Sequence, residues 1–297
     1  MTGHGDCDEQ PAHSSVEPGV SAGSDSTAII DAAWIAEHLG DPGVQLIEVD
    51  VSPAAYTTGH IPGAVLWNAY TDLRGPDYKT IALGDLERLL SRSGCTPSST
   101  LVFYGYGAAL GFWLMKAHAH HDARLLIGSR EQWALAGGEW STQVPEPPEP
   151  TATSSYPLVA PSEDLFASQA AVEGAIGDPN QILLDVRAEL EYSGERFWPS
   201  GATEDVGRAG HLPGAISVPI DLLRTGEDTL RSPEDLRDAF ENAGVSSDKQ
   251  VIVYCTIGNR ASQAWFALKY LLAYPKVSVY YGSWVEWGNA TDTPVET

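Results

Sequence analysis

The chain has 297 residues, and 43% of them are hydrophobic, which is enough apolar material for two ordinary domains. Its formal net charge of -23, with 40 acidic against 17 basic residues, argues against a general binder of nucleic acid, because such proteins carry clustered basic side chains. Three cysteines, Cys7, Cys95 and Cys255, are too few and too scattered for a disulfide framework or a paired-cysteine zinc site. With neither a signal-peptide pattern nor a long apolar run, we predict a cytoplasmic protein that does not enter a membrane.

Residues 1–26 are rich in Gly, Ser, Asp and Pro without hydrophobic periodicity, and we predict that they form a mobile tail. From Thr27 onward, helical apolar patterns alternate with short buried runs typical of strands, which predicts α/β domains with mainly parallel sheets. The predicted helices span 29–40, 83–94 and 110–121, and the predicted strands span 44–51, 100–104 and 123–128. The predicted domains cover 27–142 and 158–297, joined by a Pro- and Glu-rich linker over 143–157.

Three motifs occur twice in the same order at nearly constant spacing. GHIPGA at 59–64 returns as GHLPGA at 210–215, LVFY at 101–104 corresponds to VIVY at 251–254, and GSREQW at 128–133 corresponds to GSWVEW at 282–287. We therefore predict a duplicated domain. In this alignment Gly105 stands opposite Cys255, and the first-half loop is about three residues shorter. We expect the reactive centre only in the second half, with the first half shaping the cleft.

The segment VIVYCTIGNRAS (251–262) is the strongest candidate for chemistry. An apolar strand ends at Cys255, a loop without proline follows, and Gly258 tolerates the positive φ that a tight curl requires. Inward backbone amides, the N-terminus of the next helix and a nearby arginine would together stabilise a negatively charged sulfur, either thiolate or persulfide. A lone cysteine after a strand is more commonly inert, and the composition of the loop favours the functional interpretation here. The predicted loop residues are Thr256, Ile257, Gly258, Asn259 and Arg260.

CTIGNRAS after the strand, GHLPGA and DVRAELEY upstream of it and GSWVEW downstream resemble the tandem-domain rhodaneses, the thiosulfate and 3-mercaptopyruvate sulfurtransferases, over about residues 27–292. The resemblance implies two rhodanese-like α/β domains, of which the second is catalytic, with the cleft between them. It implies that Cys255 takes a sulfane sulfur from a small donor and passes it to cyanide or a thiol, without a metal or cofactor. The alternative is a persulfide carrier that delivers sulfur to a protein partner.

Two comparisons with the family narrow the chemistry. Rhodanese-like phosphatases use Cys-x5-Arg, whereas Cys255 and Arg260 give Cys-x4-Arg, and the shorter loop favours sulfur over a tetrahedral oxyanion. The uncharged Thr256 and Ile257 match neither the thiosulfate nor the mercaptopyruvate pattern. Glu191 stands where the family has a substrate-binding arginine. Thiosulfate remains the expected donor, with 3-mercaptopyruvate as the alternative.

Further cleft residues are candidates with a structural alternative in each case. An arginine at the end of a second-half strand would orient the donor or close a local salt bridge, and an arginine in a second-half insertion would supply positive charge or lie in solvent. Three first-half residues would border the cleft or have a structural role. These candidates are Asp185, Arg187, Arg208, His60, Asp50 and Trp67.

Overall fold

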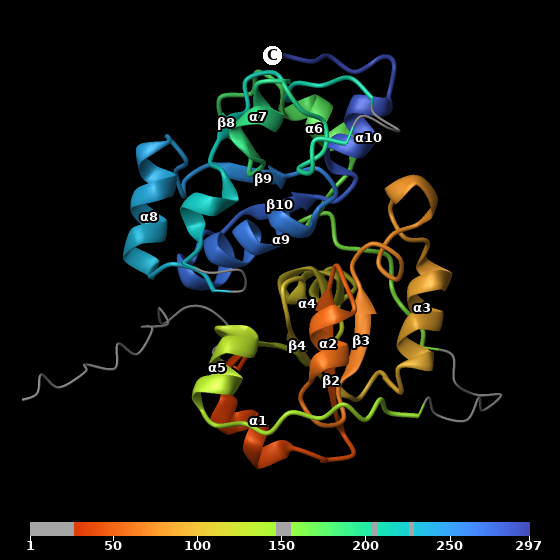
Figure 1. Ribbon diagram of the computed structural model, residues 1–297. Helices are drawn as coiled ribbons and strands as arrows, with labels where there is room; N and C mark the ends of the chain where they lie inside the picture. Colours follow the sequence, from red (N-terminus) through yellow and green to blue (C-terminus); the bar gives the residue numbers. More distant parts are fainter. Residues whose placement is uncertain (1–26, 147–155, 203–206, 226–228) are drawn as a thin grey trace, which may run out of the picture.

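The computed structural model describes residues 27–146, 156–202, 207–225 and 229–297, which form two similar halves (Figure 1). Each half is built on a five-stranded sheet, with strand order β1-β5-β4-β2-β3 in the first and β6-β10-β9-β7-β8 in the second. The strand pairings that build these sheets are parallel. The predicted fold class is confirmed. The predicted tail and most of the predicted linker lie outside the described residues.

The first half alternates strands and helices because parallel neighbours need crossover connections, which cover both faces of the sheet. Its strands are β1 (Ile29–Ile30), β2 (Val44–Asp50), β3 (Val65–Asn68), β4 (Thr100–Tyr104) and β5 (Ala123–Leu126). Its helices are α1 (Ala32–His38), α2 (Ala54–Thr58), the 3-10 helix η1 (Pro76–Tyr78), α3 (Leu83–Arg92), α4 (Ala108–Ala117) and α5 (Ser129–Leu135).

The second half repeats this order. Its strands are β6 (Phe166–Ala167), β7 (Gln181–Asp185), β8 (Ile216–Ser217), β9 (Gln250–Tyr254) and β10 (Val277–Tyr280). Its helices are α6 (Gln169–Ala175), α7 (Glu189–Tyr192), the 3-10 helix η2 (Ile220–Leu223), α8 (Pro233–Asn242), α9 (Asn259–Phe266), the π-helix η3 (Ala267–Leu271) and α10 (Ser283–Asn289). Within the described residues, no helix is both long enough and apolar enough to cross a membrane.

The structure corrects two details of the prediction. Ile29 and Ile30 form an edge strand paired with β5 instead of the first turn of a helix, because Asp31 caps α1 by accepting a hydrogen bond from the Trp34 amide at 2.8 Å. The loops after the central strands span 105–107 and 255–258, so they differ by less than predicted. The second half gains its remaining length in the helix, because α9 continues into the π-turn η3.

The repeated GHxPGA motif fastens the strand end in each half. In the first half, the His60 ring lies against the Tyr56 ring at 3.9 Å, with its Nδ1 2.9 Å from the Tyr56 carbonyl oxygen. The Ile61 amide donates to the hydroxyl of Tyr104, the last residue of β4, at 3.1 Å. In the second half the equivalent contacts join His211 to Tyr192 and Leu212 to Tyr254. The motif therefore builds the same frame twice.

The two halves share one hydrophobic core through α4 and α9, which lie against each other at the centre of the molecule (Figure 1). Phe112 of α4 contacts the rings of Trp265, Phe266 and Tyr270 at centroid distances of 6.1, 5.9 and 5.1 Å. Because α9 begins at Asn259, where the loop that starts at Cys255 ends, this packing fixes the cysteine loop at the boundary between the halves.

A buried ion pair lies beneath the strand-end tyrosine of each half. In the second half, Asp185 and Arg187 are both fully buried and 2.6 Å apart, and Arg187 also donates to the Gly210 carbonyl at 2.7 Å. In the first half, the buried Glu48 pairs with Arg130 at 2.7 Å. Removing one partner of such a pair leaves an uncompensated charge away from water.

We predict that Asp185→Asn lowers the free energy of unfolding by about 3 to 5 kcal/mol, because Arg187 stays buried without its counter-charge. Urea denaturation of the intact chain measures this value. Asp238→Asn on the exposed face of α8 is the matched control, and a loss for Asp185→Asn no larger than for this control contradicts the prediction.

Candidate functional site

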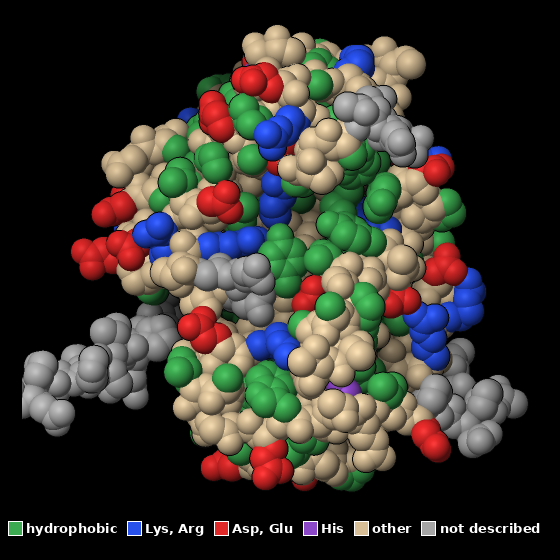
Figure 2. Space-filling view, viewed as in Figure 1, with side chains coloured by type: hydrophobic (Ala, Val, Ile, Leu, Met, Phe, Trp, Pro, Cys, Tyr) green, Lys and Arg blue, Asp and Glu red, His purple; other side chains and the backbone are tan. Residues whose placement is uncertain are grey.

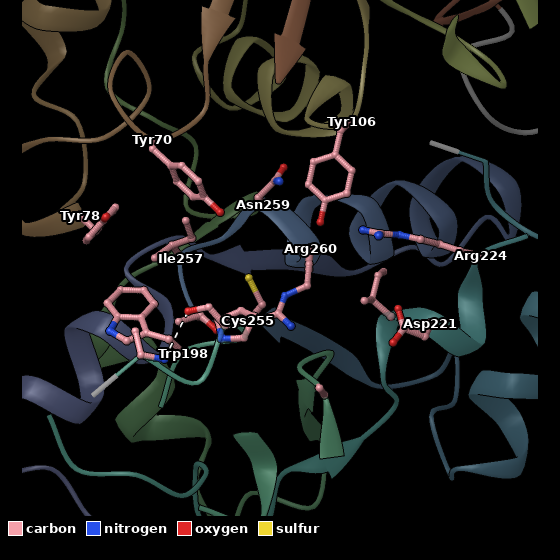
Figure 3. Close-up of a pocket in the computed structure, with 16 residues that line it drawn as sticks. Tyr70, Tyr78, Tyr106, Trp198, Asp221, Arg224, Cys255, Ile257, Asn259 and Arg260 are labelled. Carbon is pink, nitrogen blue, oxygen red and sulfur yellow. Dashed lines mark hydrogen bonds between the residues drawn. The ribbon is translucent and has the colours of Figure 1, made fainter. Parts of the chain in front are cut away.

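Cys255 lies at the carboxyl end of β9, which is flanked in the sheet by β10 and β7. In parallel α/β sheets this edge is where ligands bind, since loops and helix N-termini meet there. The cysteine has no exposed surface, yet it belongs to the wall of a pocket, into which its sulfur points (Figure 3). A small reactant in that pocket can therefore reach the sulfur atom.

The loop at 255–258 curls around this sulfur. Gly258 has φ +87°, a left-handed conformation that favours glycine, and its amide donates to Cys255 Sγ at 3.0 Å. The loop carbonyls point the other way, because those of Cys255 and Thr256 accept hydrogen bonds from the Trp284 and Val285 amides at 3.0 Å. The first turns of α10 thus hold the outer side of the loop, while the start of α9 lies beside the sulfur.

The corresponding loop of the first half cannot hold a cysteine. Gly105 replaces the cysteine and has φ +93°, and a Cβ there would lie 2.7 Å from the Val49 carbonyl oxygen. The frame around it is kept, since the Gly105 amide donates to Ser129 Oγ just as the Cys255 amide donates to Ser283 Oγ. The first half therefore has no room for a side chain at the position of the cysteine.

Arg260, expected to face the sulfur as a cation, is held by Glu191. Its two terminal nitrogens donate to the Glu191 carboxylate at 2.7 and 2.8 Å, and Thr256 Oγ1 donates to the same carboxylate at 2.5 Å. Burial raises the pKa of the Glu191 carboxyl, but the hydrogen bonds and charge of Arg260 outweigh burial and hold that pKa below its ordinary value. Much of the Arg260 charge is thus compensated inside the protein.

The pocket beside Cys255 has a volume of about 660 Å³ and lies where the two halves meet. Hydrophobic and basic side chains surround the hollow in the space-filling view (Figure 2). Tyr70 and Tyr106 extend from the first half above the cysteine, and Trp198 closes the pocket from the second half (Figure 3). Arg224 also lines it, with its guanidinium bound to Gln263 Oε1 and lying 4.9 Å from the Tyr106 ring.

A family model described as the rhodanese-like domain matches residues 31–136 and again residues 168–290. The chain belongs to the rhodanese family. The two matches confirm the resemblance and the duplication predicted from the repeated motifs.

Relatives of this rhodanese cover nearly its whole length. The sulfur carrier protein TtuD of Thermus thermophilus is 37% identical over 276 residues, which span 90% of this chain and 95% of TtuD. A protein of Haloferax volcanii, provisionally named a thiosulfate sulfurtransferase, is 36% identical across 90% of this chain and 96% of its own. Among solved structures, the anaerobic ergothioneine biosynthesis enzyme of Chlorobium limicola, in complex with trimethyl histidine, superposes with a TM-score of 0.80 at 25% identity, covering 92% of this chain and 71% of that enzyme.

The predicted loop residues of this rhodanese lie together around the sulfur, whereas the second-half charges proposed for the cleft lie elsewhere. Thr256, Ile257, Asn259 and Arg260 line the pocket with Cys255. Asp185 and Arg187 form the buried pair beneath Tyr254. Arg208 donates to the Thr293 and Trp287 carbonyl oxygens at 2.5 and 3.2 Å, which caps the end of α10 and places its charge outside the pocket wall.

The first-half candidates also lie outside the pocket wall of this rhodanese. His60 is buried between the Tyr56 and Gln143 carbonyl groups. The Asp50 carboxylate accepts a hydrogen bond from the Val51 amide at 2.6 Å, which turns the chain after β2. Trp67 is fully buried and donates to Ser93 Oγ at 2.8 Å.

Three first-half residues that were not predicted line the pocket. They are Tyr70, Tyr78 and Tyr106. Tyr106 comes one residue after Gly105, and comparison of the duplicated loops would have found it opposite Thr256. Tyr70 and Tyr78 lie in the long connection after β3, and their rings meet edge to face at 6.0 Å. None of the three repeated motifs of the sequence analysis lies in that connection, so it was not predicted to reach the site.

We predict that Glu191→Gln lowers the free energy of unfolding at neutral pH by about 3 kcal/mol, because Arg260 loses its counter-charge. The Glu191 pKa is depressed in the folded protein, so its charge contributes stability above pH 4.5 and loses that contribution as the pH falls through the folded-state pKa. Urea denaturation at a series of pH values should therefore show a gap between the two proteins that narrows below pH 4.5.

Glu189→Gln is the control for this experiment, because Glu189 is exposed on the same helix, α7. A gap for Glu191→Gln that stays constant down to acidic pH, or that equals the gap for Glu189→Gln, contradicts the role given to the pair.

Proposed function

We propose that this rhodanese is a sulfurtransferase that moves a sulfane sulfur from thiosulfate or 3-mercaptopyruvate, through a Cys255 persulfide, to a thiophilic acceptor such as cyanide or a thiol. The observation that carries the proposal is the Gly258 amide aimed at Cys255 Sγ at 3.0 Å, at a strand end that opens into a pocket. A backbone amide and a helix N-terminus at this point favour a sulfur atom that carries negative charge.

The reaction has two steps. The Cys255 thiolate attacks the outer sulfur of thiosulfate, the S–S bond of the donor breaks, and sulfite leaves with the electron pair. The terminal sulfur of the new persulfide is then attacked by the acceptor nucleophile, the persulfide S–S bond breaks, and the Cys255 thiolate is restored. In both steps the negative charge on Cys255 Sγ faces the Gly258 amide, which supports stabilisation by a preformed donor.

The surroundings of the loop support sulfur chemistry over phosphoryl chemistry. Phosphate recognition depends on an arginine free to bind the oxyanion with both of its terminal nitrogens. Arg260 uses those nitrogens on Glu191 instead. Arg224 adds a guanidinium to the pocket wall on which the anionic end of a small donor can bind.

The alternative within the same chemistry is a carrier that takes one sulfur and gives it only to a protein. The relative named as a sulfur carrier protein, TtuD, supports this alternative, and the relatives named for thiosulfate sulfurtransferase support the enzyme. Both require the same persulfide, and they differ in whether a small acceptor releases it. The thiol chemistry suits the reducing conditions of the predicted cytoplasmic location.

We predict that incubation with thiosulfate or 3-mercaptopyruvate adds one sulfur atom to the intact protein and none to Cys255→Ser, as measured by mass spectrometry. Cys95→Ser should still gain the sulfur, because burial raises the pKa of the Cys95 thiol to about 12 and keeps that thiol protonated. If neither donor adds a sulfur that depends on Cys255, the proposed function is wrong.

Steady-state assays with cyanide separate the enzyme from the carrier. Repeated turnover, with many thiocyanate molecules formed per chain, supports the enzyme. A single sulfur released per chain, followed by no further product, supports the carrier and overturns the catalytic part of the proposal.

A further inference from the structure

Arg74, in the connection after β3, reaches across the boundary between the halves. Its Nη1 donates to the Tyr281 carbonyl oxygen at 3.0 Å, and its guanidinium carbon lies 3.6 Å from the centre of the Tyr281 ring. The Tyr281 hydroxyl in turn donates to the carbonyl oxygen of Leu73. A first-half arginine is thus fixed against the residue that precedes the Gly282–Ser283 turn of the second half.

This arginine is buried without a carboxylate partner. Only 5% of its surface is exposed, and its Nε and Nη2 form no hydrogen bond with any described residue. The two arginines that line the pocket both have a partner for their guanidinium groups. Arg260 forms an ion pair with Glu191, and Arg224 donates hydrogen bonds to Gln263 Oε1. Burying a guanidinium with two nitrogens that form no hydrogen bond costs folding free energy. This cost points to a role of Arg74 other than packing.

The Nη2 atom of Arg74, which forms no hydrogen bond with a described residue, lies next to the cysteine loop. A Cβ placed on Gly258 would lie 2.5 Å from Arg74 Nη2, so this nitrogen lies against the glycine whose amide donates to Cys255 Sγ. Burial lowers the pKa of the Arg74 guanidinium, and interactions with Tyr281, Cys255 and Glu286 oppose that effect. Glu286 is exposed, and a tyrosine phenol is neutral at pH 7, so Cys255 is the buried group of the three that can carry a negative charge, as a thiolate or persulfide.

We propose that Arg74 is a positioning residue that supplies the counter-charge for the Cys255 thiolate and persulfide from the half that lacks the cysteine. This inference rests on the proposed function, because the counter-charge matters only if Cys255 carries a negative charge. The contacts of Arg74 do not depend on which sulfur donor is used. Arg74 acts through the Gly258 loop: an unpaired positive charge against that glycine lowers the energy of a negatively charged sulfur that accepts from the amide of the same glycine.

Other titratable groups face the same sulfur and must be separated from Arg74. They are Arg260 from α9, whose charge is compensated by Glu191, Arg224 and the exposed Asp221 on the pocket wall, and Tyr70, Tyr78 and Tyr106 from the first half. None of these is changed by a substitution at Arg74. A change in the pH response of Cys255 on replacing Arg74 therefore reports on this one charge.

The test is the pH profile of Cys255 alkylation by iodoacetamide in the full chain, measured by mass spectrometry of the peptide that contains Cys255. Arg74→Met should move the midpoint of the profile to higher pH by about one unit or more, because an opposite charge at short range is lost. Arg74→Lys keeps the charge and should keep most of the original midpoint. A midpoint left unchanged by Arg74→Met, or moved equally by Arg74→Lys, overturns the inference.

Tyr281→Phe is the matched control for a purely structural role. It removes the hydroxyl that donates to Leu73 and leaves the ring on which Arg74 lies. It should weaken the contact between the halves without moving the alkylation midpoint. A shift for Tyr281→Phe as large as that for Arg74→Met assigns the effect to domain packing and overturns the inference.

A measurement on the unmutated protein covers the case in which Arg74→Met does not fold. The side-chain ¹⁵N resonances of Arg74 should titrate with the same midpoint as Cys255 alkylation, and resonances that do not respond overturn the inference. Failure of this proposal is distinguishable from failure of the proposed function. A Cys255 that gains sulfur without any dependence on Arg74 refutes only the former, and a titration coupled to Arg74 without sulfur loading refutes only the latter.

Discussion

The hydrogen bond from the Gly258 amide to Cys255 Sγ is the contact on which the rest of the site depends. It exists because Gly258 takes a left-handed conformation and because α10 binds the loop carbonyls on the opposite side. The packing of α9 on α4 fixes the second end of the loop. The site is therefore built by the same contacts that join the two halves, and its geometry is fixed before any substrate enters.

The two halves are copies of one frame that differ at the residue after the central strand, Gly105 in the first and Cys255 in the second. Arg74 and Arg224 occupy matching places, each in an isolated bridge after its β3 or β8 strand, to Thr80 and Leu230 respectively. Arg224 lies over Tyr106 and lines the pocket, whereas Arg74 lies over Tyr281 behind the cysteine loop. An arginine of each half thus lies against a tyrosine of the other half. Because Gly105 leaves no room for a side chain in the first half, only Arg74 lies against a loop that contains a cysteine.

The Glu191–Arg260 pair is the second contact that holds the loop. The resemblance leads us to expect a substrate-binding arginine at position 191, and in this chain that position carries the carboxylate that binds Arg260. The two side chains meet as a buried ion pair, with Thr256 bonded to both. These contacts tie the cysteine loop and the start of α9 to α7.

The sequence was sufficient to predict the repeated α/β fold and the cysteine loop, because both depend on local patterns: apolar strands, the GHxPGA turns and a proline-free loop with Gly258. It was insufficient for the long-range partners. His60, Asp50 and Trp67, predicted as cleft candidates, belong to the first-half frame, while Tyr70, Tyr78 and Arg74 reach the site from a connection that none of the three repeated motifs marks. Burial of Arg74 without an ion pair depends on how two halves pack, which no pattern along the chain encodes.

The central claim is that Cys255 carries the transferred sulfur inside the Gly258 loop. A crystal structure of the chain after soaking with thiosulfate tests it most directly. The account predicts one additional sulfur bonded to Cys255 Sγ, lying in the pocket beneath Tyr70 and Tyr106, with the loop and the Glu191–Arg260 pair unmoved. Sulfur bound to another cysteine, or an unmodified Cys255 in crystals whose dissolved protein transfers sulfur to cyanide, would contradict the account.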